Sequence, residues 1–194
     1  MADTNKIKYG IENVHYAVAT IAADGSATYG TPKRLPGAVS LSLDPQGDTN
    51  PFYADNIAYY VTVANNGYEG DFELAKIPED FLVDVLGYKR DSNGVLLEDP
   101  NAGTVSFALL FQFEGDVFAK RHVIYRCAAA RPSVSGSTKT EQIEPQTETI
   151  SLTVTSVYNP DIDADVVKAT ANPVDNATQY NAWFNAVYQS TAMA

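Results

Sequence analysis

Residues 147–157, Thr-Glu-Thr-Ile-Ser-Leu-Thr-Val-Thr-Ser-Val, form the clearest pattern in the chain. Ile150, Leu152 and Val154 alternate there with threonine and serine. Because successive side chains of a strand point to opposite faces, this period of two predicts a β-strand with one face in a core and the other in solvent. Residues 38–43, Ala-Val-Ser-Leu-Ser-Leu, repeat the alternation and predict a second strand of the same kind.

Turn-forming residues divide much of the remaining chain into further strand candidates. These candidates are residues 13–20, 57–64, 69–77 and 165–170, with a turn expected at residues 65–67. A hairpin is expected from Thr104 to Cys127, with Glu114-Gly115-Asp116 at its tip. Its first strand places large apolar side chains on one side, namely Val105, Phe107, Leu109, Phe111 and Phe113. The chain is therefore predicted to be mainly β.

Two segments carry the spacing of an amphipathic helix instead. From Pro78 to Leu86, apolar residues recur at helical spacing, with Glu79 and Asp80 near the start and Gly87 at the stop. Between residues 175 and 188 the spacing i, i+3, i+4, i+7 is occupied by Tyr180, Trp183, Phe184 and Val187. We expect one domain over residues 1–194, a β-sandwich or flattened barrel with a flanking helix and a C-terminal helix.

The composition narrows the possible functions. Hydrophobic residues make up 45% of the 194 residues, which is enough for a core, whereas charged residues make up only 19%. Such a chain suits a protein that hides much of its surface against copies of itself. The 24 acidic and 13 basic residues give a formal charge of −11, which disfavours nucleic-acid binding because that affinity comes mainly from basic side chains on phosphates. A wall that lets DNA slide past would be acidic for the same reason.

Residues suited to catalysis or metal binding are sparse. His15 and His122 each lie in a predicted strand without a neighbouring His or Cys at ligand spacing, so both are interpreted as structural. Cys127, the single cysteine, lies in an apolar run and is interpreted as a small buried hydrophobe. Residues 161–165 resemble the start of a calcium loop, but Val166 and Asn172 stand where that loop needs Gly and Glu. We predict no enzyme, no cofactor and no metal.

Three features favour a role in assembly. The connection from Asp44 to Asn56 is long, and its aromatic residues Phe52 and Tyr53 need somewhere to bury. One face of a predicted strand carries three carboxylates, Glu69, Asp71 and Glu73, for which a solvated edge-strand face is the alternative interpretation. Basic residues gather between positions 120 and 139, namely Lys120, Arg121, Arg126, Arg131 and Lys139.

The order and spacing of several stretches resemble the major tail proteins of siphophages that infect Gram-positive bacteria. The stretches are residues 29–39 (Tyr-Gly-Thr-Pro-Lys-Arg-Leu-Pro-Gly-Ala-Val), 45–49, 52–55, 64–70, 131–138 and 144–149. None of them is a catalytic motif, and the resemblance depends on their being collinear over most of the chain. It is weaker after Val157.

The resemblance implies a tail-tube fold, two packed sheets with a flanking helix, in subunits that form hexameric rings stacked into a hollow tube. In such tubes neighbouring subunits join their inner sheets into one barrel, and long loops reach the adjacent subunit or ring. The partners implied are further copies, tape-measure and tail-terminator or baseplate proteins, and double-stranded DNA that passes through the lumen without specific binding. The protein would be made in the host cytoplasm, without a membrane span, and end in the tail tube of the virion.

Three sets of residues are candidates for roles in such a tube. The lumen-facing acids would be Glu69, Asp71 and Glu73, because like-charged carboxylates repel phosphates. The inter-subunit loop would use Pro45, Gln46, Gly47, Asp48, Thr49, Phe52 and Tyr53. The basic residues between 120 and 139 would pair with acids of the next ring.

Other functions remain open from the sequence. A carbohydrate- or receptor-binding β-sandwich would use exposed aromatic rings to stack on sugars and would stay a monomer or small oligomer. An enzyme on a β-sandwich would need a convergent polar site, which the sequence does not display. A tube protein of a phage-derived secretion device would share the fold and differ in what the bore carries.

Overall fold

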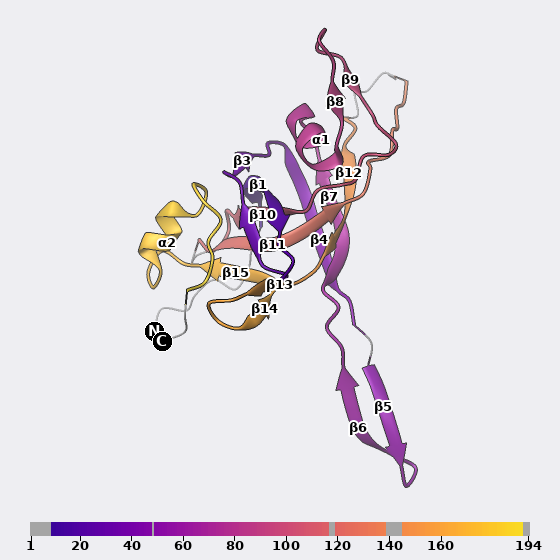
Figure 1. Cartoon of the computed structure of the whole chain (residues 1–194), viewed down its shortest axis with the longest axis vertical. Coiled ribbons are helices and arrows are strands. Elements are labelled where there is room, and N and C mark those ends of the chain that lie inside the picture. The colour runs from indigo at the N-terminus through magenta and orange to yellow at the C-terminus, as the bar shows by residue number, and fades with distance from the viewer. Residues whose placement is uncertain (1–8, 48, 117–118, 139–144, 192–194) are drawn as a thin grey trace.

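The computed structural model describes residues 9–47, 49–116, 119–138 and 145–191, so Asp48 and Lys139 of the predicted sets lie outside the described residues (Figure 1). One antiparallel sheet of nine strands forms the body. Its strands are β1 (Ile11–Ile21), β2 (Ala27–Tyr29), β3 (Lys33–Arg34), β4 (Ala38–Pro45), β7 (Tyr68–Leu74), β10 (Phe107–Phe113), β11 (Arg121–Ala129), β12 (Glu148–Val154) and β15 (Lys168–Ala171). The predicted mainly-β fold is confirmed.

The sheet is open, and it curls around its core. The hydrogen-bonded order is β2-β1-β10-β11-β12-β7-β4, with β3 beside β1. Strand β11 changes partner along its length: Arg121–Ile124 pair with β15, whereas Cys127–Ala129 pair with β12. Strands β4 and β1 approach each other across the core without forming a ladder in the described residues. The two walls of this one curled sheet take the place of the two layers of a sandwich.

Three two-stranded ribbons extend from the body. They are β5 (Thr49–Ala54) with β6 (Ile57–Val63), β8 (Lys89–Arg90) with β9 (Leu96–Leu97), and β13 (Val157–Asn159) with β14 (Ala164–Val166). The first is the longest of these and projects from the end of the sheet away from α1 (Glu79–Leu86) (Figure 1). We call β5, β6 and the residues that join them the arm.

Strands β10 and β11 are buried on both faces, so the fold has two cores. On one face Phe107 and Leu109 pack with Phe72 of β7, Ile150 of β12 and the helix residue Phe81. On the other face the buried residues are Ala27, Ala108, Leu110, Val123, Tyr125, Val157, Ala171 and Trp183. The alternation seen in the sequence at residues 105–113 thus supplies one core, and the intervening residues supply the other.

Helix α1 closes one end of the larger core. Pro78 is the N-cap, one residue later than expected, and Gly87 ends the helix with a φ of 74°, which glycine adopts without strain. Phe81 packs edge-on against Tyr16 and Phe107, with ring centroids 5.0 and 5.4 Å apart. Glu79 and Asp80 in the first turn complement the helix dipole.

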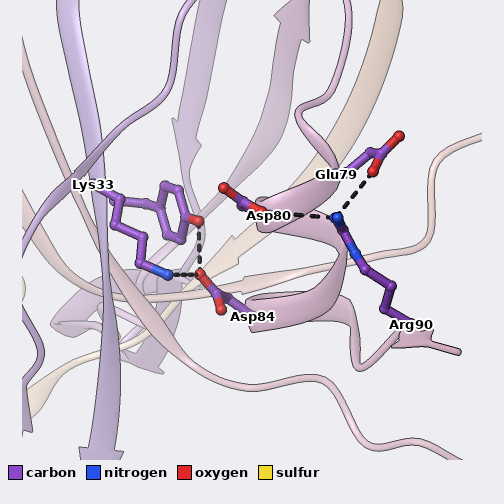
Figure 2. Close-up of polar contacts among 6 residues, drawn as sticks. Lys33, Glu79, Asp80, Asp84 and Arg90 are labelled. Carbon is purple, nitrogen blue, oxygen red and sulfur yellow. Dashed lines mark hydrogen bonds and ion pairs between the residues drawn. The ribbon is translucent and has the colours of Figure 1, made fainter. Parts of the chain in front are cut away.

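The outer side of α1 is tied to the sheet by polar contacts (Figure 2). The carboxylate of Asp84 accepts hydrogen bonds from the Tyr16 hydroxyl at 2.8 Å and from Lys33 Nζ at 2.6 Å. Arg90 of β8 reaches the carboxylates of Glu79 at 3.0 Å and Asp80 at 3.9 Å. Burial, and next the hydrogen bond to Asp84, raise the pKa of Tyr16 well above its usual value, so the phenol stays protonated.

The expected C-terminal helix at 175–188 is shorter than predicted. Helix α2 spans only Ala177–Ala182. Beyond it the chain turns so that the Trp183 side chain enters the second core, where its Nε1 donates a hydrogen bond to the His122 carbonyl at 3.2 Å. The helical spacing of Tyr180, Trp183 and Phe184 therefore reflects burial of a turning segment rather than a longer helix.

Candidate assembly surfaces

The prediction of a loop at residues 44–56 is wrong, because most of these residues lie in strands β4 and β5. The β4–β7 ladder ends at Pro45 opposite Tyr68, and the ribbon resumes at Thr49 opposite Val63. Backbone hydrogen bonds between Gln46 and residues 66 and 67, 2.8 and 2.9 Å long, join the two ladders. The turn predicted at residues 65–67 is therefore wrong. These residues connect the two ladders, and the turn of the hairpin lies at residues 55–56. Pro51 made this segment look like a loop in the sequence. Both strands of a two-stranded ribbon are edge strands, however, and an edge strand tolerates proline.

The arm exposes large apolar side chains along its length. Each is more than half exposed: Phe52 63%, Tyr53 65%, Ile57 61%, Tyr59 72% and Tyr60 63%. Asp55 and Asn56 form its two-residue turn with φ of 52° and 60°, the left-handed pair that tight hairpins require. Residues 44–67 contain no Lys or Arg. Exposed apolar side chains gathered in this way are typical of interaction surfaces, so the arm is a candidate for one.

The three predicted acids of β7 do share the outer face of the sheet. In the register, Glu69 lies between Asp44 and Thr153, Asp71 between Ser42 and Ser151, and Glu73 between Ser40 and Thr149. We call these nine residues the acid–hydroxyl face. All of them come from β4, β7 and β12, whose inward residues occupy the larger core.

Hydroxyl groups hold two of the four carboxylates of this face, those of Glu73 and Asp71, in place. Thr147 and Ser40 donate to the two Glu73 oxygens at 2.5 and 2.9 Å, and Ser151 donates to Asp71 at 2.8 Å. The hydrogen bond from Thr147, followed by that from Ser40, lowers the pKa of Glu73 below its ordinary value. The arrangement yields a wall of fixed negative charge without a basic residue among its nine positions.

The predicted basic residues do not form one patch. Arg121 turns inward: its guanidinium lies 3.8 Å from the Tyr180 ring centroid, donates to the Tyr180 carbonyl, and donates to Gln112 at 3.1 Å. Arg131 pairs with Glu98 at 3.3 Å. Lys120 lies in the turn before β11, where its amide donates to Asp116 at 3.2 Å, and Arg126 is partly exposed on β11. The charge pattern alone did not indicate that Arg121 packs against aromatic rings.

Two stretches of strand edge are further candidate assembly surfaces. Strand β4 is the last strand of the hydrogen-bonded order. Strand β12 pairs with β11 only through Leu152–Val154, so Glu148–Thr149 of β12 lie beyond that ladder. Unpaired backbone groups on such edges are templates for pairing with another chain.

The cysteine and the two histidines considered for chemistry are packed against apolar or aromatic residues. Cys127 is fully buried, and burial raises the pKa of its thiol. The His15 ring stacks on Phe184 at 4.7 Å, and the His122 ring stacks on Phe111 at 5.1 Å. Among the described residues no three His, Cys, Asp or Glu side chains gather in a metal-binding group. None of the described helices has the length and hydropathy needed to cross a membrane.

Comparisons with known proteins identify a family. Residues 2–114 match the sequence model of a family described as phage tail tube protein. No curated protein matches the chain. Among solved structures, one described as "Cryo-EM structure of the anti-feeding prophage cap (AFP tube terminating cap)" is similar with a TM-score of 0.39 and 10% identity, over 89% of this chain and 97% of that chain.

Proposed function

From the match over more than half of its length, the chain belongs to the phage tail tube protein family, and we propose that it is the self-assembling subunit of a tail tube. Copies would join head to tail into hexameric rings, and the rings would stack into the non-contractile tube through which DNA is ejected into the host. The structural observation that supports the assembly step is the arm, which exposes five large apolar side chains and has none of its described side chains in either core. Head-to-tail contacts of this kind generate rings and open-ended tubes.

The acid–hydroxyl face is proposed to line the bore. A ring repeats its carboxylates around the axis, which gives a negative wall that repels the phosphates of passing DNA. The hydroxyl groups of Ser40, Thr147 and Ser151 already donate to carboxylates of this face, so fewer of its donors are left for DNA to bind. Such a wall would guide double-stranded DNA without binding it specifically.

The strand edges support a continuous wall around that bore. Strand β4 of one copy would pair with the free part of β12 in the next, which would extend the β4–β7–β12 wall from copy to copy. This pairing satisfies backbone groups that are otherwise left to water.

Further contacts belong to the same proposal. Arg126, which is partly exposed on β11, and Lys120, which precedes β11, would meet acids of the next ring. Tape-measure and tail-terminator or baseplate proteins would set the length and ends of the tube. The subunit would be made in the host cytoplasm and carried in the virion as a structural component, not as an enzyme.

The test is electron microscopy of the purified protein over a concentration series, with sizing chromatography alongside. The wild type should form rings or hollow tubes with a regular axial repeat. The variant Phe52→Ala/Tyr53→Ala should stay monomeric, because it removes two of the exposed aromatic groups of the arm. The matched control Val95→Ala removes an apolar side chain that is 53% exposed on the β8–β9 side and should assemble normally.

Two results would count against the proposal. A wild-type monomer at every concentration, together with saturable binding to glycans, would favour the carbohydrate-binding alternative. Unchanged tubes from the double variant would remove the arm from the assembly contact.

A further inference from the structure

An apolar groove lies at the end of the curled sheet from which the arm departs. It has a volume of about 260 Å³ and opens between β4 and β7 on one side and β10, β11 and β15 on the other. Its walls include Leu41, Leu43, Tyr68, Phe113, His122 and Lys168. Small-molecule pockets are usually larger, roughly 300–1,000 Å³. This groove is better suited to side chains inserted from another protein segment.

The groove combines aromatic walls with a single positive charge. Lys168 Nζ lies 5.0 Å from the centroid of the Tyr68 ring, which holds the ammonium group at the rim. The described lining contains no carboxylate. Its chemistry therefore favours an occupant that is aromatic and carries negative but no positive charge.

The arm has that chemistry. Phe52 lies directly opposite Tyr60 in the ribbon, and both rings are about two-thirds exposed. Asp55 stands at the turn, and no Lys or Arg occurs from residue 44 to residue 67. The arm points away from its own body, so it is placed to fill the groove of a different molecule (Figure 1).

We propose that the groove is the receptor for the arm of a second copy of this chain. Phe52 and Tyr60 enter between the apolar walls, and the Asp55 carboxylate approaches Lys168. The inference rests on the proposed function and specifies which surface receives the arm. Donor and receptor consist of different residues, so each copy can give its arm to one neighbour and receive the arm of another, which is the heterologous arrangement that the proposed rings need.

Disulfide trapping between two separately purified variants tests the contact. Leu43→Cys places a thiol in the groove, and Tyr60→Cys places one on the arm, so only a contact between molecules can join them. The native Cys127 is fully buried and does not compete. Because a disulfide needs Cα atoms about 4.4–6.8 Å apart, the pair should give at least about tenfold more covalent dimer than the control pair Val95→Cys with Tyr60→Cys.

Three outcomes separate the possibilities. Tubes that form without this cross-link, or that cross-link equally at Val95, overturn the inference and leave the proposed function standing. Absence of any ring, tube or cross-link at every concentration overturns both. An intramolecular disulfide between Leu43→Cys and Asn5→Cys in one chain would identify the N-terminal segment as the occupant and overturn the inference.

Charge reversal tests the polar part of the contact independently. Lys168→Asp should raise the concentration needed for assembly by about two- to fivefold, as expected for one exposed ion pair. Adding Asp55→Lys to that variant should restore most of the loss, because the pair is re-formed with its signs exchanged. A double variant that assembles no better than Lys168→Asp alone would overturn the assignment of Lys168.

Discussion

The β4–β7 ladder and the β5–β6 ladder are consecutive parts of the same two stretches of chain, yet they differ in what lies beneath them. In the body part, Phe72 and Leu74 of β7 are buried against α1, β10 and β12. In the arm, aromatic side chains of the same size stay more than half exposed. The comparison indicates that strand-forming residues are enough to form a two-stranded ribbon. The stability of that ribbon depends on a second layer of side chains packed against it. The body contains that layer, whereas in the proposed tube a neighbouring molecule would supply it to the arm.

The largest expected difference between the two parts is in amide hydrogen exchange. In the monomer, amides of β10 and β11 should exchange only through global unfolding, which costs about 5–15 kcal/mol. Amides of β5 and β6 should exchange with protection near zero, because an isolated two-stranded hairpin is marginally stable at best. Assembly should then protect the arm selectively. Equal protection in the monomer would contradict the idea that the arm lacks support.

A matched pair of substitutions compares the two parts directly. Phe81→Ala should lower the free energy of unfolding by about 3–5 kcal/mol, because it leaves a cavity between Tyr16 and Phe107. Phe52→Ala should change it by less than about 0.5 kcal/mol, because that side chain is exposed. Urea denaturation of the monomers measures both. A loss for Phe52→Ala as large as for Phe81→Ala would show that the arm is part of the folded unit.

Arg121 tests whether the C-terminal segment belongs to the body. Arg121→Ala removes the stacking on Tyr180 and the hydrogen bonds to its carbonyl and to Gln112. We expect a loss of about 1.5–3 kcal/mol, typical of hydrogen bonds made by a charged group, and faster proteolysis after residue 175. Arg126→Ala on the same strand is the control. If assembly fails while the fold and the C-terminal segment stay intact, Arg121 acts at an interface after all.

The smallest expected effect concerns pH and the acid–hydroxyl face. The pKa of Glu73 is lowered in the folded state, so its contribution to stability is present above the unfolded-state pKa and is lost as pH falls through the folded-state pKa. Wild type should therefore be slightly more stable than Glu73→Gln at pH 7, with the gap closing below about the ordinary glutamate value of 4.5. Thermal unfolding from pH 7 to pH 3 measures this gap. A gap that widens toward acid would contradict the assigned hydrogen bonds.

The sequence was most informative where one local pattern decided the structure. The alternation at residues 147–157 predicted β12, and the spacing of Phe81, Val85 and Leu86 predicted α1, because each pattern reports a single buried face. The placement of Glu69, Asp71 and Glu73 on one face also followed from period two. Their hydroxyl partners did not, because Ser40 lies on β4 and Thr147 just before β12, both distant from β7 in sequence.

The failures have different physical causes. Strand β5 was predicted as loop because Pro51 and its turn-forming neighbours outweighed its strand formers, although an edge strand tolerates them. Arg121 was predicted on an outer surface because charge alone was considered, whereas its planar guanidinium stacks on Tyr180. The partner exchange within β11 depends on contacts between distant segments, which no local pattern encodes.

The open edge of β4 has a consequence for when assembly begins. Its sequence, Ala-Val-Ser-Leu-Ser-Leu-Asp-Pro, contains no lysine, the residue that commonly blocks unwanted pairing on strand edges. Mutual repulsion between subunits of formal charge −11 opposes their association. Salt weakens that repulsion, since the screening length falls from about 10 Å at 0.1 M to about 3 Å at 1 M. Raising the ionic strength should therefore shorten the lag before the first ring appears and leave the fold of each subunit unchanged.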